Sequence, residues 1–362
     1  MSRQNELTAV PQETTVIDAD VHVSRGISAE EMADYLDEPH KSRVLQEYCY
    51  PATKGADWDP YLGGDIVERR LDGPETVEQT LQEKFGIDYP ILNPMMGLAR
   101  LPDSNLAVEL MRARNDIFLD KFIDGTDFPG LALITTQKPD KAAEEIDRMA
   151  NEDQIVGLFV ESTGPHPPLG DPSYDVLYQA AEDNGLNIAY HAAAGYNFKY
   201  DFPLQNRGFE QFLEIHSLAH LWSQSETLTS LIVQGVPEKF PDLKFTFLEA
   251  GISWVPYMMW RLNKEYSIRK REAPLLERSP EEYIRDQFYF ASQPLGEPNH
   301  PNQMGKMIDI IGAESLMFAT DYPHWDFDNP RELDKHLRAT YSEAEREQVL
   351  SRTAKEAFDL DI

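Results

Sequence analysis

Eight short apolar runs, rich in β-branched and aromatic residues, recur along the chain and alternate with segments of helical period. The runs occupy residues 16–23, 88–95, 128–136, 155–163, 186–193, 243–251, 287–293 and 315–322. The helical segments include residues 105–124, 140–151, 173–185 and 255–266. Apolar strands that alternate with helices are typical of a parallel sheet whose outer face the helices cover. Eight such units predict a closed (β/α)8 barrel, with an open, doubly wound sheet as the alternative.

The 362 residues of the chain fit one barrel of this kind. Two long irregular segments, residues 37–75 and 195–208, follow the first and fifth predicted strands. Neither holds a core of its own, so we expect both to be loops over the barrel mouth. We therefore predict a polar N-terminal tail over residues 1–15 and a single α/β TIM barrel domain over residues 16–362.

The charge balance of the chain is strongly acidic, with 33 basic and 63 acidic residues and a net charge of −30. Such a field repels nucleic acids and anionic lipids, so we expect neither as a partner. The acidic residues recur along the whole chain and do not form a tail. This pattern favours a halophilic protein, whose acidic surface is kept soluble and screened by salt, over an ordinary acidic protein.

Three absences from the sequence predict a cytoplasmic protein. No segment approaches the roughly 20 apolar residues that a membrane span needs. The first 15 residues lack the apolar region of a secretory signal. Cys49 is the single cysteine, which excludes an intramolecular disulfide and a cysteine-based zinc cluster.

Ionisable residues stand at the ends of four predicted strands, where the active sites of such barrels lie. They are Asp20, His22, His191, Glu249 and Asp321. Side chains two residues apart on a strand share a face, so Asp20 and His22 both point into the barrel. Gathering such groups away from water is unfavourable unless they pair or bind a cation. Two histidines and two aspartates suit Zn²⁺ or Mn²⁺, and also Fe²⁺.

Each of these residues also has a structural interpretation when taken alone. His191 could be an ordinary hydrogen-bonding group, and Asp321 could cap the helix that follows the eighth strand. The Asp20-X-His22 pattern is short enough to arise by chance. Chance is a much poorer explanation for their joint placement at the ends of strands one, five and eight, and this placement favours a metal site.

Other polar residues are weaker candidates. His324, three residues after Asp321, would project over the mouth and contact the substrate or take part in catalysis; the alternative is a contact at a helix N-terminus. Arg25 could pair with a substrate carboxylate or form a surface ion pair. Tyr196 belongs to an alternating aromatic run that either lines the pocket or anchors the strand-five loop.

Two further histidines, His216 and His220, lie four residues apart on a predicted helix, which is a ligand spacing. No HExxH motif accompanies them, so we favour a structural or supporting role. The sequence contains neither a GxxxxGK[ST] nor a GxGxxG phosphate motif.

Several motifs resemble the amidohydrolase-related (amidohydrolase 2) family of metal-dependent TIM barrels. They are IDADVHV on strand one, the strand-five histidine, PDLKFTFLEAGISWVPYMMWRL and FATDYPHWDFDNP. The resemblance runs from Val16 to the C-terminal helix, and it includes the group of aminocarboxymuconate-semialdehyde, resorcylate and carboxyvanillate decarboxylases. It implies that one divalent metal ion is held by Asp20, His22, His191 and Asp321.

The chain departs from the family pattern at two positions. Relatives commonly have His-X-His on strand one where this chain has Asp20-X-His22, although an acidic first ligand also occurs in the decarboxylase branch. Relatives often have a histidine at the end of strand six where this chain has Glu249, which could bind metal, act as an acid–base group or orient His191. Strand four has no lysine that could be carbamylated to bridge two metals, so we expect one metal.

The predicted function is that of a mononuclear metal enzyme acting on a small-molecule carboxylate or carbonyl substrate. The favoured reaction is non-oxidative decarboxylation of a small aromatic or unsaturated acid, with Asp321 as the general acid. The alternative is hydrolysis of an ester, lactone or amide, with Asp321 as the general base. A third interpretation is a non-catalytic binding barrel. The sequence leaves open whether the chain forms a homo-oligomer.

Overall fold

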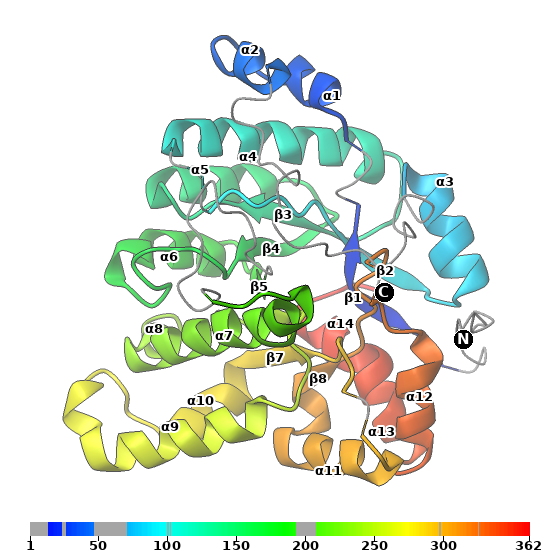
Figure 1. The fold of residues 1–362 in the computed structure, drawn as a ribbon, viewed down its shortest axis with the longest axis vertical. Coiled ribbons are helices and arrows are strands. Elements are labelled where there is room, and N and C mark those ends of the chain that lie inside the picture. Colours follow the sequence, from blue (N-terminus) through cyan, green and yellow to red (C-terminus); the bar gives the residue numbers. More distant parts are fainter. Residues whose placement is uncertain are drawn as a thin grey trace.

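The computed structural model describes residues 14–23, 27–46, 71–99, 101, 103–192, 208–296, 298–324 and 326–362. Its centre is a sheet of eight parallel strands in the order of the sequence (Figure 1). The strands are β1 (Ile17–His22), β2 (Tyr89–Asn93), β3 (Gly130–Ile134), β4 (Ile155–Glu161), β5 (Asn187–His191), β6 (Phe245–Leu248), β7 (Phe288–Ala291) and β8 (Leu316–Met317).

Hydrogen bonds between β1 and the chain that follows β8 close the sheet into a barrel. The Ala19 amide donates to the Phe318 carbonyl at 3.0 Å, and the His22 amide donates to the Tyr322 carbonyl at 2.8 Å. Val21 and Tyr322 form a parallel bridge between the same segments. The predicted (β/α)8 barrel is therefore confirmed, and the doubly wound alternative is wrong.

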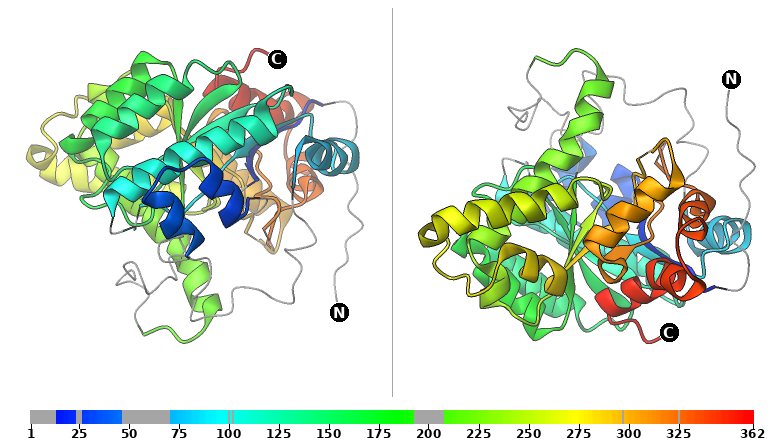
Figure 2. Two further views of the ribbon diagram at one scale, coloured as in Figure 1. Left: turned by 90° about the horizontal axis from the view of Figure 1, so that it is seen from above. Right: turned by 90° about the horizontal axis from the view of Figure 1, so that it is seen from below.

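Helices connect the strands and form an outer layer around the barrel (Figures 1 and 2). They are α1 (Ala29–Asp34), α2 (His40–Leu45), α3 (Pro74–Val77), α4 (Ser104–Phe118), α5 (Pro139–Met149), α6 (Asp175–Asp183), α7 (Phe212–Val233), α8 (Val236–Lys239), α9 (Val255–Arg269), α10 (Pro280–Gln287), α11 (Pro301–Ile311), α12 (Pro330–Arg338), α13 (Glu343–Glu347) and α14 (Thr353–Ala357). Short π-helical turns extend α3, α4 and α13, at Glu78–Lys84, Leu119–Ile123 and Gln348–Arg352. No helix in the described ranges is both long and apolar enough to cross a membrane.

The predicted loop after β1 is only partly a loop. Helix α2 lies within its first part, and α3 begins at residue 74. Residues 47–70 of this loop and residues 195–207 of the predicted loop after β5 lie outside the described residues.

The turn that follows β6 packs directly on the end of β7. Gly251 has a left-handed φ of 61°, and its amide donates to the Gln293 carbonyl at 2.9 Å. A side chain at this position would bring its Cβ to 2.5 Å from the Pro294 carbonyl oxygen, so the close approach requires glycine. This turn holds the preceding residues, including Glu249, at the carboxyl end of the barrel.

Candidate metal centre

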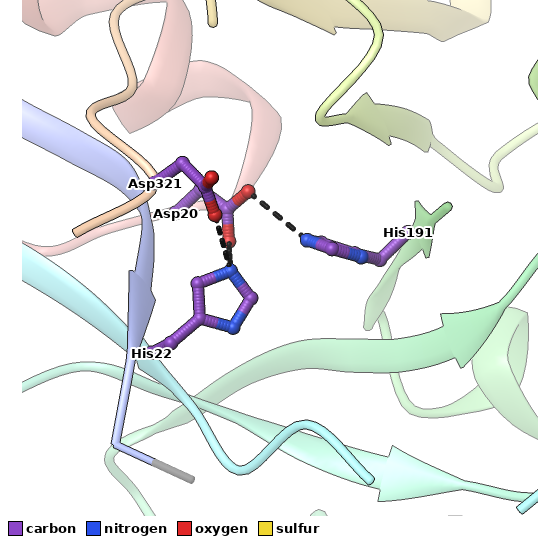
Figure 3. A group of neighbouring side chains, drawn as sticks. All are labelled: Asp20, His22, His191 and Asp321. Carbon is purple, nitrogen blue, oxygen red and sulfur yellow. Dashed lines mark ion pairs between the residues drawn. The ribbon is translucent and has the colours of Figure 1, made fainter. Parts of the chain in front are cut away.

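Four side chains meet at the carboxyl ends of the strands, as Figure 3 shows, and all four are buried. Asp20 and His22 lie on β1, His191 ends β5, and Asp321 follows β8. His22 Nε2 lies 3.3 Å from Asp20 Oδ1 and 2.7 Å from Asp321 Oδ1. His191 Nε2 lies 3.4 Å from Asp20 Oδ2. The structure thus brings together the four residues that the sequence predicts as metal ligands.

The surroundings of His191 fit a bound cation. Its Nδ1 lies 2.6 Å from the carbonyl oxygen of Ala192, which can only accept, so Nδ1 carries the hydrogen. In the neutral ring the lone pair of Nε2 then faces Asp20 Oδ2, and neither atom has a hydrogen-bond partner. Buried acceptors that face each other are unfavourable unless a proton or a cation lies between them. Two imidazoles and two carboxylates are ligands that a divalent cation of the Zn²⁺ or Mn²⁺ type accepts.

The negative charge around His191 also favours a bound cation. Burial lowers the pKa of His191, but the carboxylates of Asp20 and Glu249 outweigh this effect and hold the pKa above its ordinary value. The pocket therefore favours positive charge beside this ring. A metal cation supplies that charge without requiring a protonated ring.

The position of the Asp321 carboxylate is fixed by its backbone conformation and by hydrogen bonds. Its φ of 62° is left-handed, a conformation that aspartate adopts at a cost and that often marks functional positions. Its amide donates to the Asp20 carbonyl at 3.0 Å, and its Oδ2 accepts from Gln293 Nε2 at 3.2 Å. Burial, followed by the nearby charge of Asp20, raises the pKa of Asp321 well above its usual range. This environment disfavours an isolated carboxylate at Asp321 and favours a proton or a cation beside it.

His324 lies directly against this carboxylate. Its Nδ1 is 2.6 Å from Asp321 Oδ1, and its ring centroid is 4.4 Å from that of His22. The alternative role considered for Asp321, as the cap of the helix that follows the eighth strand, does not hold. Helix α12 is capped by Asn329, whose side chain accepts from the Arg331 amide at 3.0 Å, so Asp321 does not cap it.

Glu249 joins the site from the end of β6. It shares the left-handed backbone of Asp321, with a φ of 52°, and it is buried. Its Oε2 lies 3.3 Å from His191 Nε2, and its Oε1 lies 3.3 Å from His220 Nε2 on α7. Burial, followed by the charges of Asp321 and other carboxylates, raises the pKa of Glu249 well above its usual range.

Three polar residues that support the metal centre were not predicted from the sequence. Asn93 Nδ2 donates to Asp20 Oδ1 at 2.6 Å, and Gln293 supports Asp321 as described above. Asp18 accepts from the amide and the hydroxyl of Thr320 at 2.9 Å and 2.6 Å, which fixes the segment that leads to Asp321. Burial raises the pKa of Asp18 to about 7, against the hydrogen bonds from Thr320. Asp18 lies two residues before Asp20, so the alternation of strand side chains could have identified it.

Two predicted substrate-contact residues, Arg25 and Tyr196, lie outside the described residues. His216 and His220 lie on α7 as expected, and His220 contacts Glu249, which in turn contacts His191.

Comparisons with known proteins cover most of the chain. A family model described as Amidohydrolase matches residues 85–360. Gamma-resorcylate decarboxylase from Rhizobium sp. (strain MTP-10005) is 25% identical over 340 residues, which cover 89% of this chain and 98% of the relative. The crystal structure of 5-carboxyvanillate decarboxylase from Sphingomonas paucimobilis has a TM-score of 0.72 at 21% identity, over 96% of this chain and 99% of that one. Dihydroxybenzoic acid decarboxylase from Polaromonas sp. JS666, solved with manganese and 2-nitroresorcinol, has a TM-score of 0.69 at 19% identity, over 96% and 98% of the two chains.

Proposed function

Since the chain belongs to the amidohydrolase family matched over residues 85–360, we propose that it is a metal-dependent decarboxylase of a small aromatic acid. The observation that carries this proposal is the buried group of Asp20, His22, His191 and Asp321 at the carboxyl ends of the strands. The relative in Rhizobium and the structural neighbours named above are decarboxylases of hydroxylated aromatic acids by name, which supports the same reaction.

A divalent metal ion would be held by Asp20, His22, His191 and Asp321. When bound, it would supply a Lewis acid that neutralises the negative charge of the substrate. Asn93 and the Ala192 carbonyl would orient the ligands Asp20 and His191 through the hydrogen bonds that they make with these side chains. Burial of the site removes water that would compete for the substrate carboxylate.

Asp321 is our candidate for the proton donor. Decarboxylation breaks the bond between the ring carbon and the carboxylate, leaves the electron pair on that carbon and requires a proton there. Burial and the charge of Asp20 favour the protonated form of the Asp321 carboxyl. His324, 2.6 Å from Asp321 Oδ1, is placed to return a proton to Asp321 after each turnover.

The proposal is tested by incubating the Mn²⁺-loaded protein with gamma-resorcylate, 5-carboxyvanillate and related hydroxybenzoates. We expect at least one of these acids to be consumed, with the decarboxylated phenol as the product. A protein that carries metal but consumes none of a broad panel of aromatic and unsaturated acids would contradict the proposal.

Replacing Glu249 by glutamine should lower turnover by about 10- to 100-fold, the range for residues that orient a metal ligand. The reason is that Glu249 Oε2 lies 3.3 Å from His191 Nε2, and glutamine keeps the shape but removes the ionisable carboxyl group. The measurement is kcat together with KM, with the exposed Glu152→Gln variant as the control. A loss as large as that caused by removing the Asp321 carboxyl would instead make Glu249 the proton donor.

We also propose that the acidic surface is an adaptation to high salt, and we expect the melting temperature to fall by several degrees between 2 M and 0.1 M KCl. Even if every one of the 33 basic residues were paired, 30 of the 63 acidic residues would be left over. Their repulsion is screened within about 3 Å at 1 M salt but only within about 10 Å at 0.1 M. A melting temperature that is independent of KCl, or higher in dilute buffer, would reject this adaptation.

A further inference from the structure

A second group of ligand-type side chains lies beside the metal centre, and its two histidines have no role in the proposed reaction. It consists of His216, His220 and Glu249, whose ligand atoms all lie within 4.8 Å of one another. We propose that this group binds a second divalent cation, and that Glu249 bridges it to the first. The inference goes beyond the proposed function, because it concerns how many ions the chain holds and not which reaction it catalyses.

Helix α7 presents the two histidines as a pair. His216 and His220 are four residues apart, which places their side chains on the same face of the helix. Their ring centroids are 5.0 Å apart, with an angle of 79° between the rings. Figure 2 shows the N-terminal part of α7, which carries both residues, projecting beyond the barrel. Histidines with this helical spacing can bind one metal ion together.

Glu249 connects the pair to the first centre. One carboxylate oxygen, Oε1, lies 3.3 Å from His220 Nε2, and the other, Oε2, lies 3.3 Å from His191 Nε2. Each oxygen therefore faces a different histidine, and each histidine belongs to a different group of ligands. A carboxylate offers two oxygens, so it can bind one ion through each of them.

The spacing of the donor atoms suits a tetrahedral ion. Two ligands of a tetrahedral Zn²⁺ with bonds of roughly 2.0–2.1 Å are separated by about 3.3 Å. The distance between His220 Nε2 and Glu249 Oε1 is 3.3 Å. Asp326 Oδ2 lies 3.6 Å from His216 Nε2, beside this group. Two imidazoles and one carboxylate form a donor set that Zn²⁺ accepts, with water as the fourth ligand.

The charge of the combined site gives an independent argument for a second ion. Four carboxylates gather here, those of Asp20, Asp321, Glu249 and Asp326, and the first three are buried. Asp20 and Asp321 face the first ion, whereas Glu249 Oε1 and Asp326 Oδ2 lie against His220 and His216. A second divalent cation would balance the charge of these two carboxylates in a site with little access to water.

The test counts bound zinc. The protein is saturated with Zn²⁺, passed through a desalting column, and analysed for zinc per chain by mass spectrometry. We expect two ions per chain in the wild type, one in His220→Asn, one in His216→Asn and one in His22→Asn, which removes a ligand of the first ion. His300→Asn, which changes an exposed histidine that belongs to neither group of ligands, should keep two.

A wild type that saturates at one ion, or histidine variants of α7 that still bind two, would overturn the inference. If the buried His220 variant fails to fold, His216→Asn gives the same answer from a partly exposed position. The count is independent of catalysis. A protein that binds two ions but consumes no aromatic acid would refute the proposed function and leave the second site intact.

Discussion

The Asp321→Asn variant should retain much of its metal but lose about 10²- to 10⁴-fold in turnover, the range for a general acid or base. Asparagine keeps the shape and one oxygen of the side chain, but it cannot hold the proton that we assign to this carboxyl. The contacts of Asp321 Oδ1 with His22 and His324, at 2.7 Å and 2.6 Å, place that proton at the centre of the site.

The measurement for this variant is kcat alongside metal per chain, with the exposed Asp153→Asn variant as the control. The metal count separates a lost proton donor from a lost ligand. Turnover near that of the wild type in metal-loaded Asp321→Asn would refute the role of Asp321 and leave His324 as the proton carrier or the barrel as a binding protein.

Removing the metal should abolish activity and lower the melting temperature. An ion that binds only the folded chain stabilises it by mass action, by about 2.7 kcal/mol at a free concentration 100 times its Kd. Without the ion, the carboxylates of Asp20 and Asp321 are buried near each other and no cation balances their negative charge. Chelator titration followed by thermal unfolding measures the effect, and added Mn²⁺ or Zn²⁺ should reverse it.

A matched variant links this effect to the predicted ligands. Asp20→Ala should bind less metal per chain than Asp153→Ala, and its melting temperature should respond less to chelator. Unchanged metal content in Asp20→Ala would show that the assignment on strand one is wrong.

The barrel could be predicted from the sequence because eight short, mostly apolar runs alternate with segments of helical period. The residues at which the strands end were predicted less accurately. The last run was predicted to extend over 315–322, but β8 covers only Leu316–Met317. One reason is that the Phe318 amide donates to the Val349 carbonyl outside the sheet, although the Phe318 carbonyl still accepts from Ala19 of β1.

The site was partly predictable for a related reason. Residues at strand ends in a barrel must converge, so Asp20, His22, His191, Glu249 and Asp321 could be grouped from their positions alone. The contact of His220 with Glu249 could not, because it depends on where α7 packs over the mouth, and no local pattern encodes that position. Gln293 was missed because a neutral amide gives no signal of chemistry until its partner is known.

The most direct test of the metal-dependent decarboxylase is the fate of the substrate carbon in D₂O. The Mn²⁺-loaded protein is supplied with a hydroxybenzoate that it consumes, and the carbon dioxide and the phenol are both quantified. We predict one carbon dioxide per phenol, one deuterium at the carbon that lost the carboxylate, and no product after chelation. Acid release from esters, lactones or amides, with no carbon dioxide from any aromatic acid, would contradict the account and identify a hydrolase.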